Sequence, residues 1–215
     1  MIRNQVRNWL GLAGLAMLIA CGAGAQTLID EWPGVKPPAA PVLKPAIVDP
    51  RTTALLLMDF TNQTCTTERR PRCAASVPKL VKLMNDARAR NMMVIYSVPG
   101  SGATSADILK ELALKAGDPV LPPLGPDKFI GSEFEKALRD RNITTLIVTG
   151  TAAHTSVLHT GGEAVLRGFK IIVPVDGMSS NDAFPELYTA WHLVNAARIS
   201  DGTTLTKTDM ITYGP

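Results

Sequence analysis

The chain has 215 residues, of which 22 are Lys or Arg and 19 are Asp or Glu, so its formal net charge is +3 at pH 7. Arg3 and Arg7 lie ahead of a short apolar run, and without these two arginines the balance is 20 to 19, or +1. No basic run, Gly-rich phosphate loop or basic and aromatic stripe is present in the sequence, which argues against nucleic-acid binding.

The first residues predict an export signal. Residues 9–20 are apolar, and this run is shorter than the about 20 residues needed to span a bilayer but has the length of a signal-peptide core. Two cleavage sites remain open. Cleavage after Ala25 would remove a signal peptide of residues 1–25, whereas cleavage after Ala20 would leave Cys21 as a lipidated N-terminus. Both predict an exported protein, periplasmic or lipid-anchored at the bacterial envelope, whose only membrane contact is the possible anchor at Cys21.

Residues 26–50 predict an extended spacer or a strap along the surface, because their prolines fix φ and remove N–H donors. Residues 51–215 then form one domain, which is long enough to bury a hydrophobic core. Cys65 and Cys73 bracket a short polar loop and are expected to form a disulfide in an oxidising compartment.

The rest of the chain predicts alternating strands and helices. A continuous apolar run, typical of a buried parallel strand, occupies residues 54–58, and further strands are expected over residues 92–97, 144–149 and 169–175, with a short edge strand at 203–206. Apolar stripes at helical spacing predict helices over residues 76–90, 105–116, 131–141, 155–168 and 183–197. This order predicts an α/β fold, a three-layer α/β/α sandwich with a mostly parallel, Rossmann-like sheet.

Ligands of such sheets gather at the carboxyl ends of the strands, and Asp59, Gly150 and Asp176 fall at such ends. Asp59 ends the first strand, Lys128 precedes a helix, and Ser156 lies six residues past Gly150 at a helix start, where backbone N–H groups can hold a developing negative charge. In this order and with this spacing, the three residues resemble the isochorismatase-like, or cysteine hydrolase, superfamily over about residues 53–199.

The resemblance implies a triad in which Asp59 is the acid/base residue and Lys128 is the lysine. Ser156 stands where the family usually has its nucleophilic cysteine. The resemblance also implies a cis peptide bond between Thr151 and Ala152, with an oxyanion hole formed by the N–H groups of Ala152 and Ser156.

Further residues near these positions are candidates for the wall of a substrate pocket: Phe60, Asn62, Phe129, Thr151, His154 and Thr155. His154 is two residues from Ser156, and such neighbours do not face each other on a helix, so His154 is not expected to act as its base. The family's optional metal site uses His and Asp after the second strand. Residues 97–102 offer no such ligand, so we expect neither a metal nor another cofactor.

A serine hydroxyl is harder to ionise than a thiol and needs an adjacent base, so the family's thioester mechanism does not carry over. The sequence instead predicts an exported isochorismatase-like hydrolase that acts on a small molecule by general acid/base catalysis at Asp59. Lys128 would orient Asp59 or bind a substrate carboxylate, and Ser156 would hydrogen-bond substrate or water. Two alternatives stay open, a catalytically silent binding member of the fold and a serine-dependent amidase or esterase. The resemblance also implies a homo-oligomer.

Overall fold

The computed structural model describes residues 27–214 of the chain. The predicted cleavage sites and Cys21 lie outside these residues. No helix in the described part of the chain is both long enough and apolar enough to cross a membrane.

The chain divides into two compact units, residues 1–37 and residues 38–215. In the first unit, the described residues form a short helix, α1 (Leu28–Glu31), and a single 3₁₀ turn (Trp32–Gly34), and all of them are exposed. The second unit holds every other helix and strand described below.

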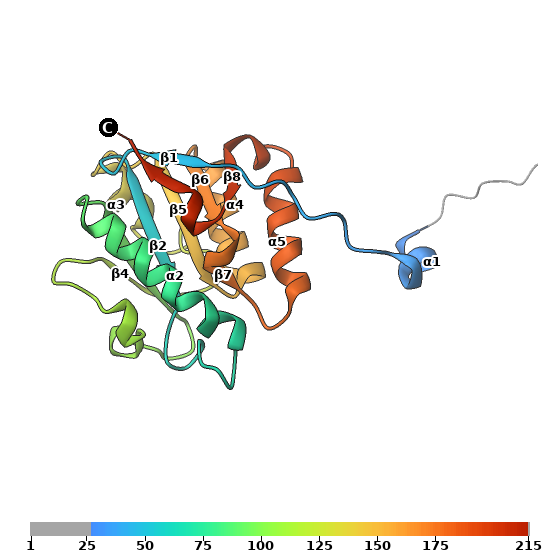
Figure 1. Ribbon diagram of the computed structural model, residues 1–215, viewed down its shortest axis with the longest axis horizontal. Coiled ribbons are helices and arrows are strands. Elements are labelled where there is room, and N and C mark those ends of the chain that lie inside the picture. Colours follow the sequence, from blue (N-terminus) through green and yellow to red (C-terminus); the bar gives the residue numbers. More distant parts are fainter. Residues whose placement is uncertain (1–26, 215) are drawn as a thin grey trace, which may run out of the picture. The chain divides into compact units, whose positions relative to one another are not determined.

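A seven-stranded sheet forms the centre of the second unit (Figure 1). Its strands are β2 (Thr53–Met58), β3 (Met93–Pro99), β4 (Val120–Leu124), β5 (Thr145–Thr151), β6 (Lys170–Pro174), β7 (Met178–Ser179) and β8 (Thr203–Thr206). The spatial order is β4-β3-β2-β5-β6-β8, with β7 paired to the end of β5, and all these pairings are parallel. The predicted α/β fold with a mostly parallel sheet is therefore confirmed, and β2 and β5 lie side by side at its centre.

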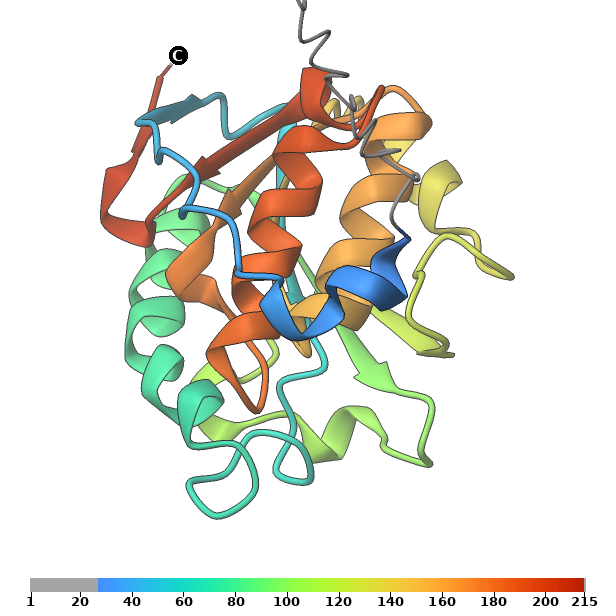
Figure 2. The same cartoon turned by 90° about the vertical axis from the view of Figure 1, so that its right-hand side faces the viewer.

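Helices cover both faces of the sheet (Figure 2). One face is covered by α2 (Pro71–Arg88), and the other by α3 (Phe134–Arg139), α4 (Leu158–Leu166) and α5 (Ala183–Asn195). All residues of β2 are buried, and its side chains alternate between the two layers. Burial of each such aliphatic side chain contributes about 1.5 to 3 kcal/mol to the free energy that stabilises the fold.

Two glycines allow the close packing that this sheet requires near its centre. A Cβ atom on Gly150 would lie 3.0 Å from the Cβ of Met58, so a side chain there would push the end of β5 away from β2. A Cβ on Gly161 would lie 3.3 Å from the Cδ1 of Ile171, so Gly161 lets α4 approach β6. The ends of β2 and β5, which carry the candidate site, are thus held close together.

The prediction of a helix over residues 105–116 is wrong, because that segment forms only two 3₁₀ turns, Ser105–Asp107 and Lys110–Leu112. The Asp107 carboxylate accepts hydrogen bonds from the N–H and the hydroxyl of Thr104, which closes the first turn locally. The backbone between the turns is engaged elsewhere, since the N–H of Leu109 donates to the carbonyl of Phe60.

Strand β4 was not predicted, because its Pro122 and Pro123 suggest a loop. Proline is tolerated in an edge strand, where no second neighbour requires its N–H group, and β4 is such an edge. Helix α2 begins at Pro71 rather than at residue 76. Ser76 therefore lies inside the helix, where its hydroxyl donates to the carbonyl of Cys73 at 2.7 Å.

The segment predicted as an extended strap ends in a short strand, β1 (Ala46–Val48). This strand pairs in parallel with β9 (Ile211–Tyr213) near the C-terminus. Val48 is 2% exposed and packs into the core, whereas Ile47 points to solvent with 77% exposure. Part of residues 26–50 is therefore joined to the body of the second unit through backbone hydrogen bonds.

Cys65 and Cys73 form the predicted disulfide, with their Cα atoms 5.2 Å apart. The bond closes the loop that leads into the first turn of α2. Replacing both cysteines with Ala is expected to lower the free energy of unfolding by about 2 to 3 kcal/mol, because the short loop becomes free in the unfolded chain. Urea denaturation measures this loss. A reductant should destabilise the wild type by a similar amount and leave the Cys65→Ala/Cys73→Ala protein unaffected, and an unchanged wild-type transition under reduction would contradict the prediction.

Candidate active site

Asp59 follows the last residue of β2, and its backbone turns sharply there. Its φ of +63° lies in the left-handed region, which Asp tolerates better than most residues and which is enriched at functional sites. The N–H of Asp59 donates to the carbonyl of Ser97 at 3.1 Å, and the hydroxyl of Thr64 donates to the carbonyl of Asp59 at 2.6 Å. These bonds fix the backbone, and only 4% of the residue is exposed.

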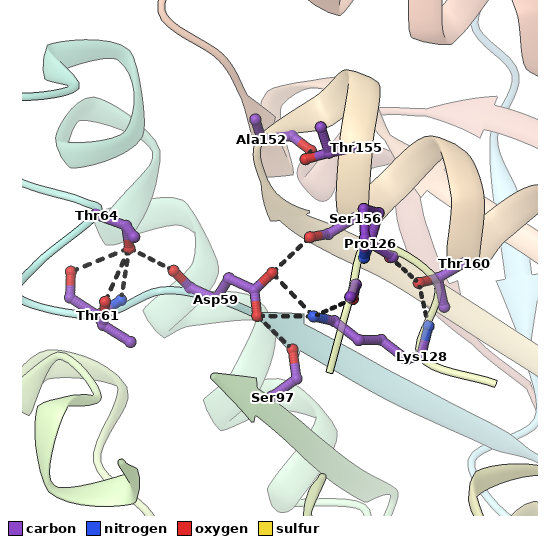
Figure 3. A network of polar contacts seen from close by, with 11 residues as sticks. Asp59, Thr61, Thr64, Ser97, Pro126, Lys128, Ala152, Thr155, Ser156 and Thr160 are labelled. Carbon is purple, nitrogen blue, oxygen red and sulfur yellow. Dashed lines mark hydrogen bonds and ion pairs between the residues drawn. The ribbon is translucent and has the colours of Figure 1, made fainter. Parts of the chain in front are cut away.

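Three donors converge on the Asp59 carboxylate. Figure 3 shows it between Ser156 and Ser97, with the ammonium of Lys128 facing both of its oxygens. The Lys128 Nζ lies 3.1 Å from each carboxylate oxygen, the Ser97 hydroxyl donates to Oδ1 at 2.8 Å, and the Ser156 hydroxyl donates to Oδ2 at 2.5 Å. The structure thus brings together the three residues that the sequence analysis selected, and adds Ser97 to them.

Lys128 is 1% exposed, so its charge is almost completely removed from water. Its Nζ also donates to the carbonyl of Gly125 at 3.2 Å. The backbone N–H of Lys128 donates to the hydroxyl oxygen of Thr160, and that hydroxyl donates to the carbonyl of Pro126. Burial raises the pKa of the neighbouring Asp127, against the opposing effect of a backbone N–H that donates to its carboxylate. A buried charge without a partner costs several kcal/mol, so Lys128 and Asp59 each require the other.

Ser156 lies in a π-helical turn, Ala153–Val157, between β5 and α4. π-Helical turns are rare and are frequent at functional sites. The Thr151–Ala152 peptide bond just before the turn is cis, as the resemblance implied. The carbonyl of Ala152 accepts hydrogen bonds from the N–H and the hydroxyl of Thr155, at 3.1 and 3.0 Å, and these close the turn (Figure 3).

His154 belongs to the same turn, but its side chain is exposed. Its Nδ1 lies 3.1 Å from the hydroxyl oxygen of Ser180, which also accepts a hydrogen bond from the N–H of Ala153. The hydroxyl of Ser156 is engaged by Asp59 instead. The group placed to accept the Ser156 proton is therefore the carboxylate, in line with the expectation that His154 is not its base.

The other residues predicted for the pocket separate into two groups. Thr155 belongs to the turn that carries Ser156, and Thr151 ends β5 just before that turn. Phe60 and Phe129 lie in the two hydrophobic cores, with exposures of 2% and 5%, and Asn62 lies on the surface. The two aromatic residues therefore belong to the hydrophobic cores, and Thr151 and Thr155 lie close to Ser156 in the chain.

Ser97 and Arg70 are two residues of the site that the sequence analysis missed. Ser97 lies in β3, beside the end of β2, and contacts the carboxylate; its place in a strand next to Asp59 was the available signal. Arg70 donates from Nη1 to the hydroxyl oxygen of Thr151 at 2.6 Å, across 81 residues of sequence. No local pattern predicts that contact.

The described residues, 27–214, contain no group of three or more His, Cys, Asp or Glu side chains arranged to hold a metal ion. The chemistry available from the cluster is proton transfer. A carboxylate lies within hydrogen-bonding distance of both an ammonium and a hydroxyl, and the hydroxyl stands on a helical turn whose N–H groups can stabilise negative charge.

Residues 53–204 match the family model described as the isochorismatase domain, which covers more than half of the chain. The chain belongs to the isochorismatase family. The matched segment contains every contact made by the Asp59 carboxylate, together with the cis peptide bond.

Among curated proteins, the chain is similar to the "Secreted isochorismatase effector Isc1" of Verticillium dahliae, with 26% identity over 117 residues. That match covers 50% of this chain and 62% of the relative, so it spans less than two thirds of the relative's length.

Solved structures resemble the fold over more of the chain. A cysteine hydrolase from Pseudomonas syringae pv. phaseolicola 1448A gives a TM-score of 0.66 at 22% identity, covering 77% of this chain and 94% of that one. N-carbamoylsarcosine amidase from Thermoplasma acidophilum gives 0.62 at 23% identity, covering 74% and 97% of the two chains. At these identities the likeness shows a shared fold.

Proposed function

We propose that this chain is a hydrolase that acts on a small molecule, with Asp59 as its general acid and base. The observation that carries the proposal is the convergence of Lys128, Ser97 and Ser156 on one buried carboxylate, at the carboxyl end of the central strands. In open α/β sheets this edge is where ligands bind. Membership of the isochorismatase family supports the same reaction class.

The direction of the hydrogen bonds suggests how the reaction proceeds. Each contact runs from a donor to the carboxylate, so Asp59 is placed to take a proton from an attacking hydroxyl and to pass it to the leaving group. Lys128 balances the charge of the carboxylate in a site with little water. General acid/base catalysis of this kind typically contributes about 10²- to 10⁴-fold in rate.

In the leading route the attacking hydroxyl belongs to water. Asp59 takes a proton from the water as it attacks the substrate, and returns it to the departing group, without a covalent intermediate. Ser156 holds Oδ2 of Asp59 in place through its hydrogen bond. The reaction then needs no thiol, which suits a family member with serine at the position we assign to the nucleophile.

A second candidate is favoured by the 2.5 Å contact between the Ser156 hydroxyl and Asp59. In this route Ser156 Oγ attacks a carbonyl carbon, and its proton passes to Asp59 and then to the departing amine or alcohol. The N–H groups of Ala152 and Ser156 would hold the oxyanion. Water then hydrolyses the acyl ester and restores the serine, which defines a serine-dependent amidase or esterase.

The surface turn indicates where a substrate would enter. Asp59, Lys128 and Ser156 are all buried, whereas Ala152 is partly buried and His154 is exposed. We propose that substrate approaches along this turn and contacts the carboxylate past Ala152. Binding without turnover at the same place would instead support a catalytically silent member of the fold.

Ser156→Ala distinguishes the two routes. The water route predicts a loss of about ten- to a hundredfold in kcat/KM, the effect of losing one hydrogen bond to a charged group. A panel of small amides, esters and vinyl ethers measures this loss, and acid-quenched wild type is analysed by intact mass. Ser105→Ala, at an exposed position, is the control. A loss of about 10⁴-fold or more, with an acyl adduct on the wild type, would contradict the water route and support the serine nucleophile.

We also propose that the protein acts outside the cytosol. The disulfide between Cys65 and Cys73 supports this, because such bonds persist in oxidising compartments. The similarity to a protein named as a secreted effector also supports a location outside the cytosol.

A further inference from the structure

Three arginines surround the start of α2, where a cation is electrostatically unfavourable. Arg69 and Arg70 precede the helix, Arg72 lies in its first turn, and that turn contains no acidic residue. The N-terminus of a helix carries partial positive charge, so each of these cations is placed against the helix dipole.

The contacts of two of these arginines account for their position at the helix start, and those of the third do not. Arg72 forms an ion pair with Glu186, and the exposed Arg69 donates to the carbonyl of Gln63. Arg70 contacts only neutral acceptors, the hydroxyl oxygen of Thr151 at 2.6 Å and the side-chain oxygen of Asn181 at 2.9 Å. Among the described residues, 27–214, no carboxylate oxygen lies within 4.0 Å of its guanidinium nitrogens.

Arg70 is partly buried, so its charge is poorly solvated as well as unbalanced. Burial, and then the nearby Arg69, lower the pKa of Arg70, and no acidic group offsets them. A guanidinium has five N–H donors, of which two are used by Thr151 and Asn181. The remaining donors and the full charge are available to a ligand.

A hydrogen bond to Thr151 links Arg70 to the segment that leads into the candidate site. Thr151 is the first residue of the cis peptide that leads into the turn carrying Ser156. The loop that carries Arg70 is closed by the Cys65–Cys73 disulfide, and the hydrogen bonds to Thr151 and Asn181 hold the guanidinium before any ligand binds. Preorganisation of this kind increases affinity because less side-chain entropy is lost on binding.

We propose that Arg70 recognises a carboxylate on the small molecule bound next to Ser156, which makes a carboxylate-bearing compound the substrate class of this site. The planar fork of arginine matches a carboxylate better than a lysine ammonium does. This inference rests on the proposed function, because only a hydrolase would make the bound molecule a substrate. The recognition of the carboxylate can nevertheless be measured without turnover.

The test is an NMR titration of the full folded protein with acetate, and with acetamide as the neutral probe, at constant ionic strength. Acetate is expected to shift the Arg70 Nε–H signal and the backbone N–H signal of Ala152 in a saturable way, and acetamide is not. Arg70→Met should weaken acetate binding about tenfold or more, the effect of losing a charge-assisted hydrogen bond. Arg72→Met, which removes a cation from the same helix start, should bind acetate as the wild type does.

Arg70→Lys provides a second variant that keeps the charge. It should bind acetate more weakly than the wild type and more tightly than Arg70→Met, because an ammonium lacks the planar fork. The absence of saturable acetate binding to the wild type, or equal affinity in wild type and Arg70→Met, would overturn the inference. Saturable binding with no hydrolysis of any compound would leave carboxylate recognition standing and contradict the proposed hydrolase. Hydrolysis of a panel compound, together with unchanged acetate binding in Arg70→Met, would support the proposed hydrolase and contradict carboxylate recognition by Arg70.

Discussion

Replacing Lys128 with Met is expected to lower the free energy of unfolding by about 3 to 5 kcal/mol, because it leaves the Asp59 carboxylate buried without its charge partner. Lys128 is 1% exposed and its ammonium contacts both oxygens of that carboxylate. Methionine keeps most of the side-chain volume, so the loss reports on charge rather than on a cavity. Denaturant unfolding followed by circular dichroism measures it.

Lys136→Met is the matched control, because Lys136 forms an exposed ion pair with Asp140 on the surface of α3. Such pairs contribute little, and the transition should coincide with that of the wild type. The Asp59→Asn/Lys128→Met protein should be less destabilised than the sum of its two single variants, since it contains neither unpaired charge. Additive losses would show that the two residues do not stabilise each other and would contradict the buried pair.

Asp59→Asn is expected to lower kcat/KM by about 10²- to 10⁴-fold, the range that general acid/base groups contribute. Asparagine keeps the shape of the side chain, and its amide can neither accept the proton of a hydroxyl nor return it to a departing group. Rates on the panel of amides, esters and vinyl ethers measure the loss, at a temperature where unfolding curves show the variant to be folded. Asp140→Asn, an exposed carboxyl-to-amide change, should retain the wild-type rate. Equal rates for Asp59→Asn and the wild type would remove Asp59 from the reaction.

The central strands could be predicted because the sequence alone reports how deeply they are buried. Residues 54–58 are a continuous apolar run and residues 146–148 are a shorter one, and the observed β2 and β5 cover the predicted segments 54–58 and 144–149 closely. The helix predicted over residues 105–116 failed because hydrogen bonds to the distant Phe60 segment, rather than helical spacing, determine that backbone. The strand β4 was missed because proline usually interrupts a sheet, and only the order of strands shows that β4 lies at an edge.

The residues of the candidate site also fall into two groups, those that could be predicted from the sequence and those that could not. Asp59 and Ser156 follow strands of the sheet, so topology alone places them at one edge, and the family resemblance supplied Lys128. Ser97 and Arg70 could not be found so easily, because their contacts join segments far apart in sequence. The left-handed backbone of Asp59 was also invisible in the sequence, since Asp carries no obligatory signal for that conformation.

The claim on which the account depends is that the Asp59 carboxylate, with Lys128 and Ser156 around it, is a hydrolytic centre rather than a silent ligand site. The most direct measurement is product formation from the panel of small amides, esters and vinyl ethers by the wild-type protein, followed by mass spectrometry in ¹⁸O-labelled water. We expect at least one compound to be converted with label incorporated, and conversion by folded Asp59→Asn to fall by about 10²-fold or more. Binding of panel compounds to the wild type without any conversion, or conversion that is unchanged in Asp59→Asn, would contradict the account.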